Sequence, residues 1–197
     1  MQEERDSHRS PTKVGTSHGL PFSRIVLTGF MGAGKSTVGQ LLSRTMGWAF
    51  LDLDQHIESS AGATAKDLFA IRGESAFRKL ESDALALALE RSETIIALGG
   101  AAIDATVNQL LLANSHGTLV VFLDAPFGTL IERCLVQERN GSPTYRPLLH
   151  QTEVAHTRFL ARRSLYQDHA SFTVDVADRS AEEVAFLIWN KACGRLS

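Results

Sequence analysis

Runs of apolar residues recur along the chain, separated by polar stretches and by glycines. Several of these runs are continuous rather than alternating, which is typical of strands buried on both faces of a parallel sheet. The predicted strands cover residues 25–27, 48–54, 94–98, 118–123 and 172–176. Helical segments separate most of them, as in sheets whose crossovers are helices. The pattern therefore predicts an α/β fold, a three-layer α/β/α sandwich with a five-stranded parallel sheet.

Helices are predicted from apolar residues at helical spacing and from the residues that flank them. Thr64 is the residue type of an N-cap, and Arg72 and Gly73 are typical of a helix end. Residues 84–89 alternate Ala with Leu, which formally indicates a strand, but both are strong helix formers and the run has no β-branched residue. We therefore predict helices over residues 37–44, 55–60, 64–71, 74–91 and 180–192.

A glycine-rich segment follows the first predicted strand and opens the first predicted helix. It reads Gly29-Phe30-Met31-Gly32-Ala33-Gly34-Lys35-Ser36, which is the G-x-x-x-x-G-K-[ST] pattern of a phosphate-binding loop in the context that the motif needs. Glycines let backbone N–H groups close around a polyphosphate, and the helix N-terminus adds the positive end of its dipole. Lys35 is expected to reach the β- and γ-phosphates, and the Ser36 hydroxyl to ligate Mg²⁺. The sequence predicts that the chain binds a nucleoside triphosphate.

Composition and charge are those of a soluble globular protein. The 197 residues suffice for one domain with a core, and 44% of them are apolar and 21% charged. The formal net charge is −2 and no Lys/Arg stripe appears, so nothing indicates a nucleic-acid partner, and an anionic ligand would be held by local arginines. The two cysteines, Cys134 and Cys193, are expected to be reduced thiols of a cytoplasmic protein.

Two segments are expected to lie outside the rigid part of the domain. Residues 1–20 have too little apolar surface to offset the entropy of ordering, so we expect a disordered tail ahead of a single domain over residues 21–197. The tail lacks the apolar region of a signal peptide, and no apolar stretch of the chain is long enough to span a membrane. A stretch with Gly, Pro and Arg at about 137–152 is predicted to be a mobile lid.

Two acids, Asp52 and Asp54, end the second predicted strand. Ligands of doubly wound sheets bind beyond the carboxyl ends of the strands, so both carboxylates are expected near the nucleotide. Two residues apart on a strand, they would point the same way unless the strand has already ended. One could reach a water on the metal while the other hydrogen-bonds an acceptor hydroxyl. The alternative is a pair of acids that only decorate an exposed turn.

Further candidates could contact an anionic acceptor. Arg78 lies next to the buried face of its helix and could project into the crevice, held by Glu81. Gly99 and Gly100 end the third strand, where glycines allow a ligand to approach the backbone. The helix predicted after the lid adds Arg162 and Arg163, although most such pairs are solvated charges.

Taken in order, these segments resemble the shikimate kinases, which are small P-loop kinases of the nucleoside-monophosphate-kinase type. The resemblance covers about residues 22–192. It rests on the phosphate loop with Thr37, Asp52-Leu53-Asp54, Phe77-Arg78-Lys79-Leu80-Glu81, Leu98-Gly99-Gly100 and Arg146-Pro147-Leu148-Leu149. It implies a monomeric enzyme that uses Mg²⁺ and moves the γ-phosphoryl group of ATP to the 3-hydroxyl of shikimate.

The resemblance also implies roles on the nucleotide side. The phosphates would be bound by Gly32, Ala33, Gly34, Lys35, Ser36 and Thr37. The acid near the metal would be Asp52, beside Ser36. Arg146 matches the lid arginine that closes over the transferred phosphate. Arg139 best fits the arginine that lies against the adenine, and Arg133 is the alternative.

On the acceptor side, Asp54 matches the aspartate that binds the ring hydroxyls and takes the proton, so the implied catalytic residues are Lys35, Asp54 and Arg146. Arg78 and Arg162 match the arginines that grip the carboxylate. Gly100, with Gly99 beside it, matches a backbone contact to the ring.

Two positions depart from the family's pattern. Ala101 stands where the family has a third glycine, which would narrow the backbone pocket under the ring. Ser164 stands in place of a proline, which leaves Arg162 and Arg163 both open as the carboxylate ligand. Two other functions stay open: a kinase of the same fold with another acceptor, such as gluconate, and a non-catalytic binding module that regulates a partner.

Overall fold

The computed structural model of the protein describes residues 20–141, 146 and 148–195. Five strands form one sheet in which every neighbouring pair is parallel. They are β1 (Arg24–Thr28), β2 (Ala49–Asp52), β3 (Thr94–Ala97), β4 (Thr118–Asp124) and β5 (Phe172–Asp175). Their order is β2-β3-β1-β4-β5, so β1 is the central strand, with Val26 opposite Ile96 and Val120. The predicted five-stranded parallel sheet is confirmed.

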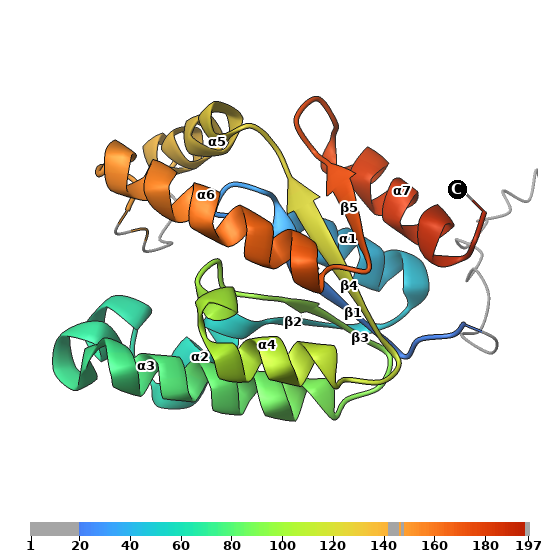
Figure 1. Cartoon of the computed structure of the whole chain (residues 1–197), viewed down its shortest axis with the longest axis horizontal. Helices are drawn as coiled ribbons and strands as arrows, with labels where there is room; N and C mark the ends of the chain where they lie inside the picture. Colours follow the sequence, from blue (N-terminus) through green and yellow to red (C-terminus); the bar gives the residue numbers. More distant parts are fainter. Residues whose placement is uncertain (1–19, 142–145, 147, 196–197) are drawn as a thin grey trace, which may run out of the picture.

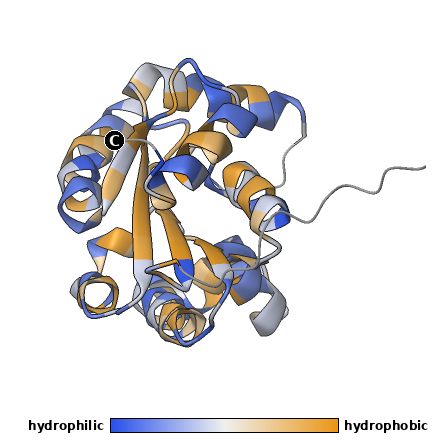
Figure 2. Cartoon of the chain, turned by 90° about the vertical axis from the view of Figure 1, so that its right-hand side faces the viewer, coloured by the Kyte–Doolittle hydropathy of each residue, from blue (hydrophilic) through white to orange (hydrophobic). Residues whose placement is uncertain are grey.

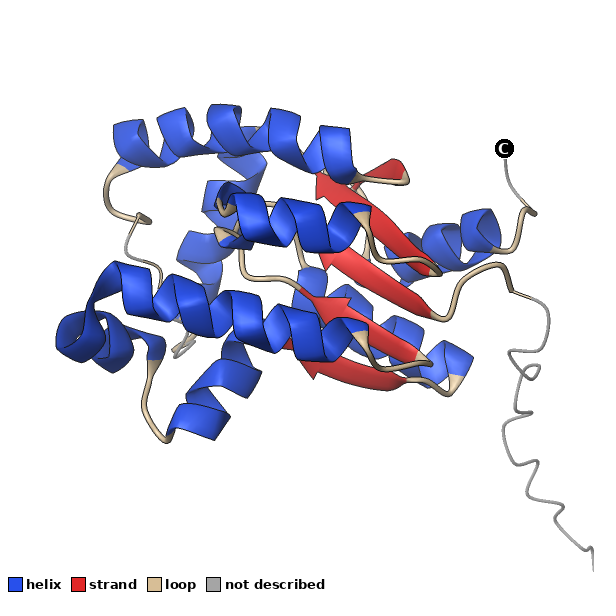
Figure 3. Ribbon diagram, turned by 60° about the horizontal axis from the view of Figure 1, so that its bottom comes forward, coloured by secondary structure: helices blue, strands red, loops and turns tan. Residues whose placement is uncertain are grey.

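Helices cover both faces of the sheet (Figures 1 and 3). On one face α1 (Lys35–Met46) and α7 (Ala181–Ala192) pack together, and the other face carries α3 (Ala65–Leu89), α4 (Thr106–Ala113) and α6 (Thr152–His169). The remaining helices are α2 (Leu53–Ala61), the 3₁₀ helix η1 (Ala102–Asp104) and α5 (Phe127–Arg139). This is the predicted three-layer α/β/α sandwich.

The core lies between the sheet and its two helical layers. Ile25, Leu27, Ile95 and Ile96 of the central strands have no exposed surface, and neither has Leu42 of α1. Figure 2 shows the strands as the most apolar part of the molecule, while the helices carry polar residues on their outer sides. Strands buried on both faces explain the continuous apolar runs of the sequence.

The second strand ends earlier than predicted. β2 stops at Asp52, whose carboxylate accepts a hydrogen bond from Gln55 N at 3.3 Å and so caps α2. Asp54 therefore lies in the first turn of α2 rather than on the strand, and the predicted strand end at residue 54 is wrong. The physical reason is the capping preference of aspartate, which starts a helix by satisfying an otherwise unpaired N–H group.

The predicted helices over residues 64–71 and 74–91 form one element, α3, with a kink. Thr64 caps it by accepting from Asp67 N at 3.2 Å, as predicted. Gly73 interrupts the helical backbone, with φ 80° and ψ 166°, at the predicted helix end. The alternating Ala–Leu run is helical, as predicted, and buries Leu85 and Leu89.

Residues 1–19 of the predicted tail, and residues 142–145 and 147 of the predicted lid, lie outside the described residues. The limits of tail, domain and lid therefore stay predictions. Within the part of the chain that the structure describes, no helix is both long and apolar enough to cross a membrane.

All five strands run in one direction, so the segments that follow them share one edge of the sheet. After β1 the chain enters α1 on one face, whereas after the neighbouring β3 it enters η1 and α4 on the other. Strands whose connections leave to opposite faces open a crevice between them, and this is where ligands of such folds bind. The candidate residues of the sequence gather at this edge.

Leu42→Ala tests the core. Leu42 is fully buried, so removing its side chain should lower the free energy of unfolding by about 2–5 kcal/mol through lost burial and a cavity. Urea unfolding followed by circular dichroism measures the change. The matched control is Leu110→Ala on α4, where the side chain is 57% exposed and the expected change is within about 0.5 kcal/mol. Equal effects at both positions would contradict this core.

Candidate active site

The glycine-rich loop between β1 and α1 has the backbone that only glycine adopts easily. Gly29, Gly32 and Gly34 have φ values of 142°, 80° and 86°. A methyl group built on Gly29 would lie 2.5 Å from the carbonyl oxygen of Leu123 on β4. The loop therefore folds tightly against the sheet edge, and Gly34 starts α1, so the N-terminal N–H groups of that helix face the loop.

Lys35 crosses this loop. Its Nζ donates hydrogen bonds to the carbonyl oxygens of Gly29 at 2.8 Å and Phe30 at 3.1 Å. Burial lowers the pKa of Lys35, and the carboxylates of Asp54 and Asp52 act against that shift. A cation held over a nest of N–H groups is the arrangement that binds a polyphosphate.

Ser36 and Asp52 lie side by side at the start of α1 and the end of β2. The Ser36 hydroxyl donates to Oδ2 of Asp52 at 2.5 Å. A hydroxyl and a carboxylate are hard oxygen donors, which suit Mg²⁺. Both predicted metal ligands therefore occur together, and their chemistry fits the ion.

Asp54 and Glu81 meet beside Gly99, which follows β3. A methyl group built on Gly99 would lie 2.5 Å from Oδ1 of Asp54 and 2.8 Å from Oε1 of Glu81. Burial, and then the Asp52 carboxylate, raise the pKa of Asp54 to about 6, while Lys35 opposes the shift. Burial also raises the pKa of Glu81 to about 7, against the effect of Arg78. The site thus holds one buried and one partly buried carboxyl group, and the pKa values of both are unusually high.

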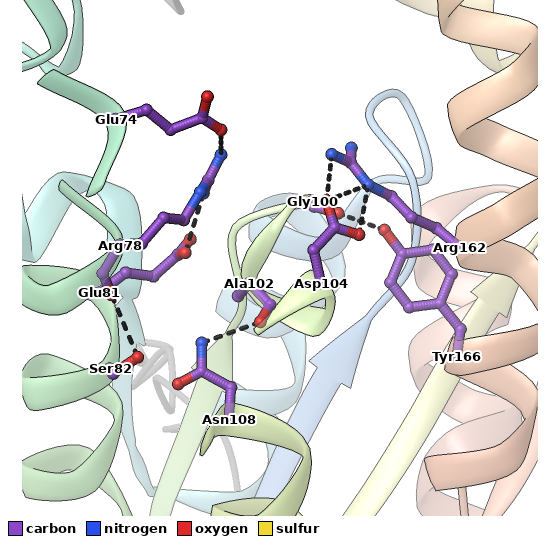
Figure 4. Close-up of polar contacts among 10 residues, drawn as sticks. All are labelled: Glu74, Arg78, Glu81, Ser82, Gly100, Ala102, Asp104, Asn108, Arg162 and Tyr166. Carbon is purple, nitrogen blue, oxygen red and sulfur yellow. Dashed lines mark hydrogen bonds and ion pairs between the residues drawn. The ribbon is translucent and has the colours of Figure 1, made fainter. Parts of the chain in front are cut away.

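Arg78 projects from α3 at the side of the site (Figure 4). Its Nη1 donates to Oε2 of Glu81 at 2.9 Å and its Nη2 to Oε1 of Glu74 at 3.3 Å. The guanidinium also lies 5.6 Å from the ring centre of Phe69 and 5.7 Å from that of Phe77. Glu81 is 1% exposed, so the expected carboxylate partner of Arg78 is present and buried.

Arg162 and Arg163 are adjacent on α6 but face different surroundings. Arg162 is buried and makes a bidentate pair with Asp104 of η1, and its guanidinium carbon lies 6.0 Å from the ring centre of Phe30. Arg163 pairs instead with Asp124 at the end of β4, and its side chain is 46% exposed. Figure 4 shows Arg162 facing Gly100 of the glycine segment after β3.

The glycine segment after β3 accommodates Ala101 without strain. Ala101 has φ −103° and ψ −4°, values that non-glycine residues adopt, and it precedes η1. The Tyr166 hydroxyl of α6 donates to the carbonyl oxygen of Gly100. The missing third glycine therefore leaves this segment regular and attached to α6.

A cavity of about 480 Å³ opens beside the glycine loop. Its lining includes Gly32, Gly34 and Thr37, together with Arg133 of α5. Arg133 donates to the carbonyl oxygens of Val176 at 2.7 Å and Ala177 at 2.8 Å. Arg139 lies at the exposed end of α5, and the residues that line the cavity within the described chain do not include it.

Arg146 is the first residue of the Arg-Pro-Leu-Leu motif in the predicted lid. Its Nη2 donates to Oε1 of Gln137 at 2.5 Å. Its charge contributes to the lowered pKa of Lys35, so the two cations lie within electrostatic reach of each other. A ligand with several negative charges would relieve this repulsion.

Asp104 and Tyr166 belong to the site but were not among the candidates. Tyr166 lies four residues after Arg162, so helical spacing places the two on one face and could have identified it. Asp104 follows no recognisable motif, and its partner Arg162 is 58 residues away in the chain.

Sequence comparison gives the family. A family model described as Shikimate kinase matches residues 31–192. The shikimate kinase of Lactococcus lactis subsp. lactis is 41% identical over 160 residues, which cover 81% of this chain and 92% of that protein. The shikimate kinase of Thermobifida fusca is 40% identical over 83% of this chain and 91% of that protein.

Comparison of structures agrees with the sequences. The shikimate kinase of Acinetobacter baumannii, solved in complex with shikimate, superposes with a TM-score of 0.77 at 30% identity over 88% of this chain and 94% of that one. A gluconokinase from Sinorhizobium meliloti shares the fold alone, with a TM-score of 0.51 at 20% identity over 89% and 93% of the two chains. The family match over most of the chain confirms the resemblance seen in the motifs, and the chain belongs to the shikimate kinase family.

Proposed function

We propose that this chain transfers the γ-phosphoryl group of ATP to the 3-hydroxyl of shikimate, with Mg²⁺ bound to the nucleotide. As a member of the shikimate kinase family, it is a kinase that uses ATP to phosphorylate shikimate. The observation that carries the proposal is that one sheet edge brings together the phosphate loop, a partly buried Asp54 near Lys35, and Arg78 and Arg162, each paired with a carboxylate.

The nucleotide would bind at the glycine loop. Its phosphates would be held by the loop from Gly32 to Thr37, with Lys35 turning from the loop carbonyls to the β- and γ-phosphates. Mg²⁺ would bind at Ser36 and Asp52, where it would neutralise charge on the phosphates. We assign Arg133 rather than Arg139 to the adenine, because Arg133 lines the cavity that continues from the loop.

The acceptor would bind between Arg78 and Arg162, which offer planar, charged donors to its carboxylate. The backbone at Gly99 and Gly100 would lie under the ring. We assign the carboxylate to Arg162 rather than Arg163, since Arg163 pairs with Asp124 at the end of β4, whereas Arg162 lies beside Gly100 and Asp104 (Figure 4). In this arrangement the ring hydroxyls would lie toward Asp54.

Phosphoryl transfer depends on positioning and on charge neutralisation more than on covalent catalysis. Ionised Asp54 would accept the proton of the attacking hydroxyl, and Lys35 would stabilise the charge on the transferred group. Arg146 would add a second positive charge above it and help to exclude water. We also propose a cytoplasmic monomer without nucleic-acid or membrane partners; the net charge of −2 supports the absence of a nucleic-acid partner.

Release of ADP from ATP and Mg²⁺ should depend on shikimate. A coupled assay with and without shikimate, and with gluconate as a parallel acceptor, measures this dependence. ADP release with gluconate alone would instead favour the second acceptor class. Bound ATP and shikimate without ADP release would indicate a binding module.

Asp54→Asn should abolish turnover while the affinity for ATP stays within about twofold, because the amide cannot accept the proton.

The Asp54→Asn variant should also be more stable than the wild type at pH 8. The folded-state pKa of Asp54 is raised to about 6, so Asp54 favours the folded state below its unfolded pKa, and this stability is lost as the pH rises through about 6. Fluorescence titration with ATP and thermal unfolding measure both effects. Asp83→Asn on the exposed side of α3 is the control and should keep full activity. Turnover near the wild-type level in Asp54→Asn would remove Asp54 from its role.

The pH profile gives a separate test. Because the pKa of Asp54 in the free protein is about 6, kcat/KM for shikimate should fall tenfold per pH unit below that value and be flat just above it. Initial rates between pH 5 and 8, at about constant ionic strength and saturating ATP, measure the profile. A profile that is flat down to pH 5 contradicts proton acceptance by a group with this pKa.

A further inference from the structure

We propose that Asp104 is a positioning residue for the acceptor: it fixes the guanidinium of Arg162 so that one edge stays available to the substrate's carboxylate. The proposal rests on the proposed function, in which Arg162 binds that carboxylate. It assigns a role to a residue outside the motifs through which the chain resembles its family.

The geometry of the pair supports this role (Figure 4). Arg162 Nε donates to both carboxylate oxygens of Asp104, at 2.9 and 3.0 Å, and Nη2 donates to Oδ2 at 2.7 Å. These three bonds use the Nε–Nη2 edge, and Nη1 takes no part in them. A guanidinium has a second edge, formed by its two Nη groups, that can hold another carboxylate. Asp104 therefore leaves this edge for the substrate.

The backbone beneath Arg162 is fixed as well. One turn further along α6, the Tyr166 hydroxyl donates to the carbonyl oxygen of Gly100, so the helix is attached to the glycine segment on which the ring would lie. The ring of Phe30, from the phosphate loop, lies 6.0 Å from the guanidinium carbon. Asp104 fixes the side chain, and Tyr166 fixes the helix from which it extends.

Asp104 is itself held in place. It ends η1, and its N–H group donates to the carbonyl oxygen of Ala101 at 3.0 Å. Asn108 of α4, fully buried, donates to the carbonyl oxygen of Ala102 at 2.8 Å, and Gln109 donates to that of Ile103 at 2.9 Å. These hydrogen bonds restrict the backbone of η1, so the Asp104 carboxylate has little freedom to move and can orient its partner Arg162.

Asp104 also carries a charge that opposes a second carboxylate nearby. If this repulsion dominated, removing the charge would strengthen binding of the acceptor. If orientation dominates, the loss of the bidentate pair releases the rotamers of Arg162, and binding becomes weaker. Arginine is among the side chains that lose most rotamer freedom on ordering, and its bidentate geometry requires a fixed plane. We therefore expect orientation to dominate.

The test is Asp104→Asn, which keeps the shape of the side chain and one acceptor oxygen. KM for shikimate, and the dissociation constant of shikimate measured by calorimetry, should both rise about tenfold, as expected for a guanidinium that must be ordered on binding. The KM for ATP and kcat should stay within about twofold. Thermal unfolding, measured with and without shikimate, verifies that the variant is folded.

The matched control is Asp124→Asn, which removes the same kind of bidentate pair from Arg163, the next residue of α6. It should leave the affinity for shikimate within about twofold, because Arg163 is assigned no contact with the acceptor. Methyl shikimate, which has no carboxylate charge, is a second control: the effect of Asp104→Asn should disappear with it.

An unchanged or a higher affinity of Asp104→Asn for shikimate would overturn the proposal, the latter because it would identify Asp104 as a competitor of the substrate. An equal loss of affinity for shikimate and for methyl shikimate in Asp104→Asn would also overturn it. Asp104 would then act only on the stability of the segment after β3. A wild type that binds shikimate without releasing ADP would refute the proposed function instead, and the calorimetric comparison would still decide the role of Asp104.

Discussion

The acceptor side of the sheet edge depends on a position that has no side chain. The carboxylates of Asp54 and Glu81 occupy the space that a methyl group on Gly99 would fill. Burial raises the pKa of both groups, to about 6 and about 7; the Asp52 carboxylate raises that of Asp54 further, and Asp54 raises that of Glu81 further. Two such groups are tolerated where cations lie close by, and here Lys35 lies near Asp54 and Arg78 contacts Glu81. The charge arrangement of the site thus follows from a glycine in the backbone.

The cations of the site have partners in the protein before any ligand binds. Lys35 donates to loop carbonyls, Arg78 to Glu81 and Arg162 to Asp104. These contacts fix the planes of both guanidinium groups, so the entropy of ordering them is lost on folding rather than on binding. A polyphosphate or a carboxylate then meets donors already in place. The same site also lowers stability: the pKa of the partly buried Asp54 is raised to about 6, so ionising this carboxyl group at neutral pH destabilises the folded state.

Local patterns were sufficient to predict the sheet, the phosphate loop and the helical Ala–Leu run of α3, since each depends on residues close in sequence. The end of β2 was mispredicted because the capping preference of Asp52 outweighed a run that otherwise looked like a strand. Arg162 and Arg163 could not be separated from sequence: neighbours on a helix point about 100° apart, and packing on the rest of the protein decides which faces inward. Asp104 was missed because its contact joins distant parts of the chain.

The fold by itself does not select the acceptor, because a gluconokinase shares it at a TM-score of 0.51. Gluconate and shikimate both carry a carboxylate and hydroxyl groups, so one arginine would serve either. What favours a ring is the fixed arrangement of Arg78, Arg162 and Asp54 around Gly99 and Gly100, with each guanidinium tied to a carboxylate of its own. A rigid ring presents its carboxylate and its hydroxyl at one set distance, whereas an open chain must lose rotational freedom to match fixed donors. With the acceptor bound as proposed, the tethered arginines would favour a cyclic acceptor over a linear one.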